Sequence, residues 1–202
     1  MFTGIIEEVG TIKDIQKGYQ EIAMMIEAPE ILQDVSTGDS ISVNGVCLTV
    51  TTYSGRDFQV DVMPETIKAT SLRILEKGSK VNLERSMPAN GRFGGHFVSG
   101  HVDGVGTIKR KKSIANAMYY YIEVPDELNK LMMLKGSVAI DGTSLTVFGI
   151  EDSILTISLI PHTVSHTILG EKGQGDIVNI ECDMLAKYVS NMLPNQIPTN
   201  KG

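Results

Sequence analysis

Asn44-Gly-Val-Cys-Leu-Thr-Val50 and Asp141-Gly-Thr-Ser-Leu-Thr-Val147 are two versions of one heptapeptide, 97 residues apart. Further pairs of matching blocks follow the same order at an offset of 96 or 97 residues: 9–12 with 105–108, 64–72 with 161–169, and 81–84 with 178–181. A repeat of this period is too long for a solenoid unit and has the size of a small domain. The sequence therefore predicts two similar halves, each with its own core.

The repeated blocks have the composition of β-strands. They are short, rich in Val, Ile, Thr and Phe, and interrupted by Gly or Asp at intervals of about eight to twelve residues. We predict an all-β fold of two tandem, similar, six-stranded antiparallel Greek-key β-barrels, closed so that no strand edge is exposed. The expected strands include 40–43, 48–52, 58–62 and 81–84 in the first half, and 137–140, 145–150, 154–159 and 177–181 in the second.

Few helices are expected. Pro29 and Pro125 each open a short acidic segment suited to a first helical turn, and 66–75 and 163–169 favour one further short helix in each half. After the second barrel, Leu185, Tyr188, Val189 and Met192 fall on one face of an α-helix that Pro194 ends. This apolar stripe docks either on its own barrel or on copies of itself in an oligomer.

The domain limits follow from these patterns. The stretch 90–100 contains four glycines and is expected to connect the halves. We predict a first barrel over 1–97, a second over 98–184, and a C-terminal oligomerisation helix and tail over 185–202.

Composition and charge restrict the class of protein. The chain has 202 residues, a net charge of −6 and a pI near 5.2, which argues against nucleic-acid and anionic-membrane surfaces. The basic run Lys109–Lys112 is interpreted as an exposed strand end or hairpin. The first residues lack a long apolar segment, so we expect neither a signal peptide nor a membrane span, and a cytoplasmic location.

The familiar catalytic and metal-binding strings are absent from the sequence. The glycines at 170, 173 and 175 occupy the place of a turn in the first half and are interpreted as a turn. His162 and His166 have the spacing of a helical metal pair, but no third ligand accompanies them, and the two cysteines form no zinc motif. No metal site is predicted.

The informative positions are those where the halves differ inside matching blocks. Cys47 corresponds to Ser144, His101 to Ile5, Asp183 to Ser86, and His162 to Glu65. Taken singly, a lone Cys is usually a small buried hydrophobe, and a lone His usually has a structural role. Together with the repeat, the differences predict two pockets of similar shape and unequal chemistry.

At these blocks the chain resembles riboflavin synthases, enzymes built from two lumazine-binding repeats. The resemblance rests on Met1-Phe-Thr-Gly-Ile5, on Gly94-Gly-His-Phe-Val-Ser-Gly-His101 and on the two heptapeptides, and it extends from Met1 to about Met192. It implies dismutation of two 6,7-dimethyl-8-ribityllumazine molecules, in which one gives a four-carbon unit to the other. The products are riboflavin and 5-amino-6-ribitylaminouracil, and no cofactor is implied.

The resemblance also implies roles for individual residues. His101 is the natural proton carrier, because the 7-methyl group of the substrate is acidic and an imidazole titrates near pH 7. The nucleophile that activates the acceptor is Cys47, or a water or hydroxyl held by Ser40 or Ser144; these alternatives stay open. Asp183 is expected to orient or deprotonate a partner. The implied pocket lining is Gly4, Ile5, Ile6, Cys47, Leu48, Thr49, Asp61, Val62, Met63, Pro64, Glu65, Thr66, Gly100, His101, Val102, Lys135, Ser144, Leu145, Thr146, Ser158, Leu159, Ile160, Pro161, His162 and Thr163.

The implied partners are two lumazine molecules and two further copies of the chain. In the family the site lies between the first barrel of one subunit and the second barrel of its neighbour, in a homotrimer held by C-terminal helices, and docking into a lumazine synthase capsid is open. Holding two reactants in register contributes up to about 7–11 kcal/mol, which gives the duplication a physical purpose. Because Glu65 is replaced by His162 in the second half, we expect the first pocket to bind more tightly.

Two alternatives come from other classes of protein. Antenna-type lumazine proteins share the two repeats and hold lumazine or flavin without turnover, although such a binder does not need Cys47, His101 and Asp183. A flavin reductase with a similar barrel would need a nicotinamide-binding fingerprint, which the sequence lacks.

Overall fold

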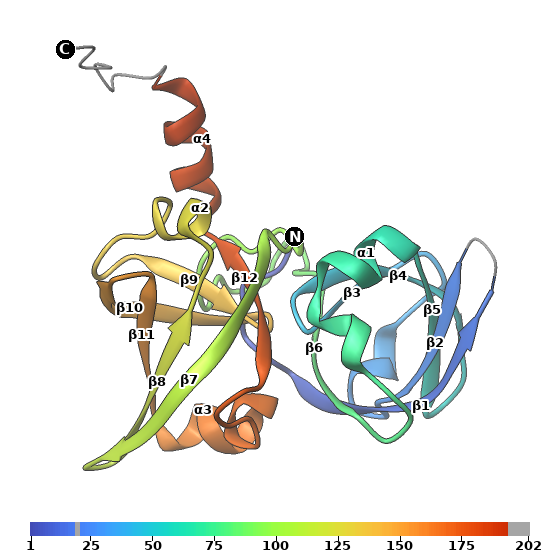
Figure 1. The fold of residues 1–202 in the computed structure, drawn as a ribbon. Helices are drawn as coiled ribbons and strands as arrows, with labels where there is room; N and C mark the ends of the chain where they lie inside the picture. The colour runs from blue at the N-terminus through green and yellow to red at the C-terminus, as the bar shows by residue number, and fades with distance from the viewer. Residues whose placement is uncertain (19–20, 194–202) are drawn as a thin grey trace.

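The structure, a computed structural model, describes residues 1–18 and 21–193 and contains two closed antiparallel β-barrels. In Figure 1 they lie side by side, the first blue to green and the second yellow-green to red. The first barrel has the strand order β1-β2-β5-β4-β3-β6, and the second has the equivalent order, read as β7-β8-β11-β10-β9-β12. The strands of the first barrel are β1 (Glu8–Lys17), β2 (Ile22–Glu27), β3 (Ser40–Val43), β4 (Val46–Tyr53), β5 (Asp57–Val62) and β6 (Lys80–Arg85). Those of the second are β7 (Gly104–Ile114), β8 (Ala117–Glu123), β9 (Ser137–Ile140), β10 (Thr143–Glu151), β11 (Ile154–Leu159) and β12 (Ile177–Cys182).

The expected pair of six-stranded barrels is confirmed, and the duplication extends to the irregularities of the backbone. The pairing register shifts after Ile12 in β1 and after Val50 in β4, and after the equivalent Ile108 in β7 and Val147 in β10. A bulge bends a strand and increases its twist, which helps a small sheet to close. Inward-facing aliphatic residues fill each barrel with a separate core.

The short helices occur where they were expected, but they are broken. The segment predicted over 66–75 is α1 (Pro64–Ala69) followed by a 3-10 turn, η2 (Ser71–Ile74), and that over 163–169 is α3 (Pro161–His166) followed by η3 (Ile168–Gly170). The break falls at Thr70 and Thr167, whose backbones are extended. Their hydroxyls donate to the carbonyls four residues earlier, at 2.7 and 2.8 Å, which competes with helix continuation. After Pro29 there is only η1 (Ile31–Asp34), and after Pro125 the single turn α2 (Asp126–Asn129).

Two equivalent asparagines join the barrels. Asn82 Nδ2 donates to Asp141 O at 2.9 Å, and Asn82 Oδ1 accepts from Ile168 N at 2.8 Å. Asn179 in the second barrel repeats both contacts with Asn44 O at 2.8 Å and Ser71 N at 2.6 Å. All four bonds are buried and cross between the halves, so the barrels face each other with approximate two-fold symmetry.

The last helix, α4 (Met184–Met192), extends away from the second barrel in Figure 1. Asp183 caps it by accepting Leu185 N at 2.9 Å. The apolar stripe is not covered by its own barrel, because Leu185, Tyr188, Val189 and Met192 are between 56 and 75% exposed. The part of the tail beyond 193 lies outside the described residues. The basic run Lys109–Lys112 lies in the C-terminal half of β7, which pairs with β8 as a hairpin.

Candidate functional site

Two short segments, one around Gly4 and one around Gly100, cross between the barrels. They carry Ile5 and His101, a pair of equivalent positions at which the halves differ. Glu84 of β6 accepts from Thr3 N at 2.7 Å and Gly4 N at 3.0 Å, while Gly4 O accepts from Ser144 N in the second barrel at 2.7 Å. The counterpart segment follows the same plan. Glu181 of β12 accepts from Ser99 N at 2.7 Å and Gly100 N at 3.0 Å, and Gly100 O accepts from Cys47 N at 2.8 Å.

Both crossings require glycine. Gly4 and Gly100 have φ values of +79° and +81°, and a Cβ on them would lie 2.6 Å from Ser144 Cβ and 2.5 Å from Cys47 Cβ. Each segment enters one barrel and forms part of the wall beside the reactive position of the other. Cys47 therefore faces residues from the chain that leads into the second barrel.

This arrangement brings several predicted residues into one pocket on the first barrel. A pocket of about 330 Å³ is lined by Cys47 from β4, by Glu65 and Thr66 from α1, and by Gly100, His101 and Val102 from the crossing segment. Cys47 and His101 also border a larger hollow of about 630 Å³, whose other side is formed by Met1 and by residues of α4. The thiol and the imidazole thus lie where two hollows meet.

The two cysteines differ in accessibility. Cys47 is half-buried, whereas Cys182 is 1% exposed, and its burial raises the pKa of its thiol to about 12. Only a thiolate is a good nucleophile, so Cys182 is chemically inert by comparison. Its place at the end of β12 is structural.

At the second barrel, the position equivalent to Cys47 has a partner that the sequence analysis did not select. His96 Nδ1 lies 2.7 Å from Ser144 Oγ, and the ring is 8% exposed. Burial lowers the pKa of His96, and the nearby charge of Asp183 opposes that effect. His96 is part of the glycine-rich block quoted above, but the repeat offers no matching block to draw attention to it.

The other side chains predicted to line the second pocket are more open than His96. Ile5, the counterpart of His101, is 48% exposed. The exposed His162 ring stacks on His166 with centroids 4.1 Å apart, and Thr163 is half-buried beside it on α3. Lys135 lies over the Phe148 ring at 4.5 Å.

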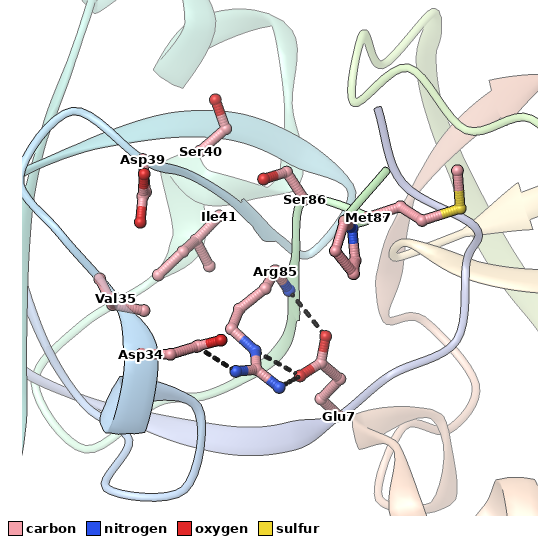
Figure 2. A pocket seen from close by; sticks show the side chains of 10 residues that line it. Glu7, Asp34, Val35, Asp39, Ser40, Ile41, Arg85, Ser86 and Met87 are labelled. Carbon is pink, nitrogen blue, oxygen red and sulfur yellow. Dashed lines mark hydrogen bonds and ion pairs between the residues drawn. The ribbon is translucent and has the colours of Figure 1, made fainter. Parts of the chain in front are cut away.

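Ser40 and Asp183 line separate hollows in the single chain. Ser40 borders a hollow of about 290 Å³, where Arg85 forms ion pairs with Glu7 and Asp34 (Figure 2). Asp183 borders the apolar hollow of about 580 Å³ beneath α4. Neither lines the pocket with Cys47 and His101, so within the chain the catalytic candidates are distributed over several surfaces.

The remaining predicted lining residues divide by burial. Leu48, Val62 and Leu159 are at most 6% exposed and belong to the barrel cores, so only their backbones are free to meet a ligand. The others lie at the surface or at its edge: Ile6, Thr49, Asp61, Met63, Pro64, Leu145, Thr146, Ser158, Ile160 and Pro161. Within residues 1–18 and 21–193, no group of three His, Cys, Asp or Glu side chains is arranged to hold a metal ion. No helix in the same part of the chain is long and apolar enough to cross a membrane.

Comparison with known proteins decides the family. The model of the lumazine binding domain matches residues 3–86 and again 99–183. The chain is 58% identical over 193 residues to riboflavin synthase of Bacillus subtilis, covering 96% of this chain and 90% of that protein. The chain belongs to the riboflavin synthase family. It is also 43% identical to riboflavin synthase of Schizosaccharomyces pombe over 98% of this chain and 96% of that one.

Solved structures agree with the fold. The structure of LumP complexed with 6,7-dimethyl-8-(1'-D-ribityl)lumazine matches with a TM-score of 0.81 at 31% identity, over 90% of this chain and 98% of that chain. The riboflavin complex of LumP gives 0.82 at 34%, over 90% and 99% of the two chains. The prediction of a riboflavin synthase, an enzyme of the transferase class, is confirmed.

Proposed function

We propose that this member of the riboflavin synthase family dismutates two molecules of 6,7-dimethyl-8-ribityllumazine between pockets that share a geometry and differ in reactive groups. The observation that carries the proposal is the pair of crossing segments, which present Cys47 with His101 on one barrel and Ser144 with Ile5 on the other. Similar pockets suit two copies of one molecule. Their different side chains allow one copy to act as donor and the other as acceptor.

The roles follow from what the reaction requires. A base must remove a proton from the acidic 7-methyl group, and His101 lines the first pocket with an exposed imidazole. Donors must stabilise the charge that develops on the ring, for which the side chain of Thr66 is available. Cys47, Ser40 and Ser144 stay the candidates for activating the acceptor, with Asp183 as an orienting group. The proposed binding set is the lining given above, and no cofactor or metal takes part.

The reacting site is proposed to lie between subunits. Within one chain Ser40, Asp183 and the Cys47–His101 pair line different hollows, and a neighbouring copy would complete them. The exposed stripe of α4 supports a homotrimer held by C-terminal helices. We further propose the domain limits 1–97, 98–184 and 185–202, a cytoplasmic location, and the tighter lumazine site in the first barrel. Association with a lumazine synthase capsid belongs to the same set of proposals.

A lumazine- or flavin-binding protein without turnover is the second candidate function. The similarity to LumP complexes with lumazine, flavin mononucleotide and riboflavin favours it. The accessible Cys47 beside His101 argues for catalysis, since binding alone requires neither group.

The test compares His101→Gln with Lys112→Gln, which changes an exposed residue of β7 away from the pocket. Both variants are incubated with 6,7-dimethyl-8-ribityllumazine while riboflavin is followed by absorbance. The loss of a general base predicts a kcat lowered by about 10²–10⁴-fold in His101→Gln and unchanged in the control. A His101→Gln variant with the wild-type kcat would remove His101 from the mechanism, and a wild-type protein that binds lumazine without forming riboflavin would favour the second candidate.

A further inference from the structure

Ser144 differs from its counterpart Cys47 in its surroundings as well as in its side chain. It is fixed from two directions, by the backbone bond from its N–H to Gly4 O at 2.7 Å and by His96 Nδ1, 2.7 Å from its hydroxyl. Cys47 has the equivalent backbone bond, but its side chain borders open hollows on the first barrel. The second barrel therefore has a hydrogen-bonded hydroxyl at the position where the first has an accessible thiol.

The backbone around His96 is built to hold the ring against Ser144. His96 N donates to Thr3 O at 3.1 Å, which ties it to the first crossing segment. A Cβ on the preceding Gly95 would lie 2.1 Å from Thr3 O and 2.8 Å from Ser144 Oγ, so no larger residue fits there. Thr3 in turn is bound by Glu84 at 2.7 Å. The imidazole therefore belongs to the same hydrogen-bonded group of residues that positions Gly4.

Nε2 of His96 is buried and has no hydrogen-bond partner among the described residues. Burying a polar atom without a partner costs free energy, so a histidine is retained here at a cost that the hydrogen bond to Ser144 must offset.

We propose that His96 is a positioning residue for Ser144, which it holds in one hydroxyl orientation toward the lumazine in the second barrel. The inference rests on the proposed function, which assigns Ser144 to that pocket. A neutral imidazole has one nitrogen that donates and one that accepts, and in either tautomer the bond to Nδ1 restricts rotation of the Ser144 hydroxyl. Burial lowers the pKa of His96, which favours the neutral imidazole, although the charge of Asp183 opposes this effect.

The chemistry of a fixed hydroxyl differs from that of a free one. A rotating serine in an open pocket points its proton at any acceptor, including water. Held by His96, Ser144 presents the same hydrogen-bonding face to every lumazine that enters, which lowers the reorganisation required in the transition state. This gives the second barrel a preorganised polar contact, whereas the first has the exposed imidazole of His101.

The experiment is a double-mutant cycle of His96→Leu and Ser144→Ala, read as kcat/KM for riboflavin formation. One hydrogen bond predicts a fall of between about twofold and tenfold for each single variant. Because His96 acts through Ser144, the double variant should be no slower than Ser144→Ala alone. Losses that multiply, or a His96→Leu variant as fast as the wild type, would overturn the inference.

A second pair of variants keeps the test independent of folding. His96→Asn places an amide at the position of Nδ1 and should retain most of kcat/KM, whereas His96→Gln carries its amide farther out, nearer the position of Nε2, and should lose as much as His96→Leu. Equal activity of the two amide variants would contradict a role through the Ser144 contact. Riboflavin formation by the wild-type protein is measured alongside, so failure of the proposed function is distinguished from failure of this inference.

Discussion

At the scale of single residues, the two halves differ both in a few residue types and in what surrounds the equivalent side chains. Cys47 and Ser144 occupy equivalent strand positions and make equivalent backbone bonds to Gly100 and Gly4. The thiol borders open hollows, whereas the hydroxyl is bound by His96. The two halves therefore share a backbone arrangement and differ chemically at a few side chains and at one buried imidazole.

The two thiols should react at very different rates. Cys47 is half-buried beside a pocket, while Cys182 is 1% exposed with a thiol pKa raised to about 12. We expect iodoacetamide at pH 8 to alkylate Cys47 and leave Cys182 unmodified in the folded protein, as peptide mass spectrometry would show. Bound riboflavin should slow the reaction at Cys47. Modification of Cys182 before Cys47 would contradict the described burial.

At the scale of elements, the crossing segments are fixed by one buried carboxylate each. Glu181 accepts both Ser99 N and Gly100 N, and Glu84 accepts both Thr3 N and Gly4 N. These bonds span about 80 residues of sequence, and they place Gly100 against Cys47 and Gly4 against Ser144. The pockets depend on this bracing as much as on the barrels.

Glu181→Gln should loosen the segment over Cys47. Glutamine keeps one acceptor oxygen and turns an amide toward an N–H group, which costs about 1–3 kcal/mol in a buried site. We expect a lower free energy of unfolding in urea and faster alkylation of Cys47 than in the wild type.

Glu84→Gln is the matched control, because it makes the same chemical change under the other segment. It should lose similar stability but speed alkylation of Cys47 less than Glu181→Gln does, because Glu84 reaches Cys47 only through Phe2, which packs beside it. An equal increase in the alkylation rate of Cys47 in both variants would contradict a specific role of Glu181 in covering Cys47.

The elements also show what the sequence can and cannot predict. Periodicity and turn residues located the strands 40–43, 137–140 and 154–159 at their observed limits, because strand formation here is a local property reinforced by the repeat. The breaks at Thr70 and Thr167 were missed, since they depend on side-chain hydrogen bonds that compete with a helix. The crossing segments and the His96–Ser144 contact depend on tertiary packing and leave no periodic signal in the chain.

At the scale of the whole molecule, α4 has an apolar surface that its own barrel does not cover. Its stripe of Leu185, Tyr188, Val189 and Met192 is more than half exposed, and it adjoins an apolar hollow of about 580 Å³. Exposed apolar surface of this kind usually marks an interaction site. A trimer through this helix would cover it and bring neighbouring hollows together.

The double variant Leu185→Glu/Val189→Glu should disrupt that association. Charges on the stripe predict a smaller species by light scattering and a loss of riboflavin formation, because the proposed site is shared between subunits. Ser113→Glu adds charge at the exposed β7–β8 hairpin, which lies at the far end of the second barrel from α4 in Figure 1, and should leave both properties near those of the wild type. An active oligomer of unchanged mass in the double variant would contradict the shared site.

The duplication itself gives the most direct test. The purified protein is mixed with 6,7-dimethyl-8-ribityllumazine alone, without added cofactor, and riboflavin and the pyrimidine product are quantified against the lumazine consumed. We expect dismutation, with one riboflavin and one 5-amino-6-ribitylaminouracil formed for every two lumazines consumed. Tight binding of lumazine with no riboflavin formed would contradict it, and would return Cys47 and His101 to structural roles.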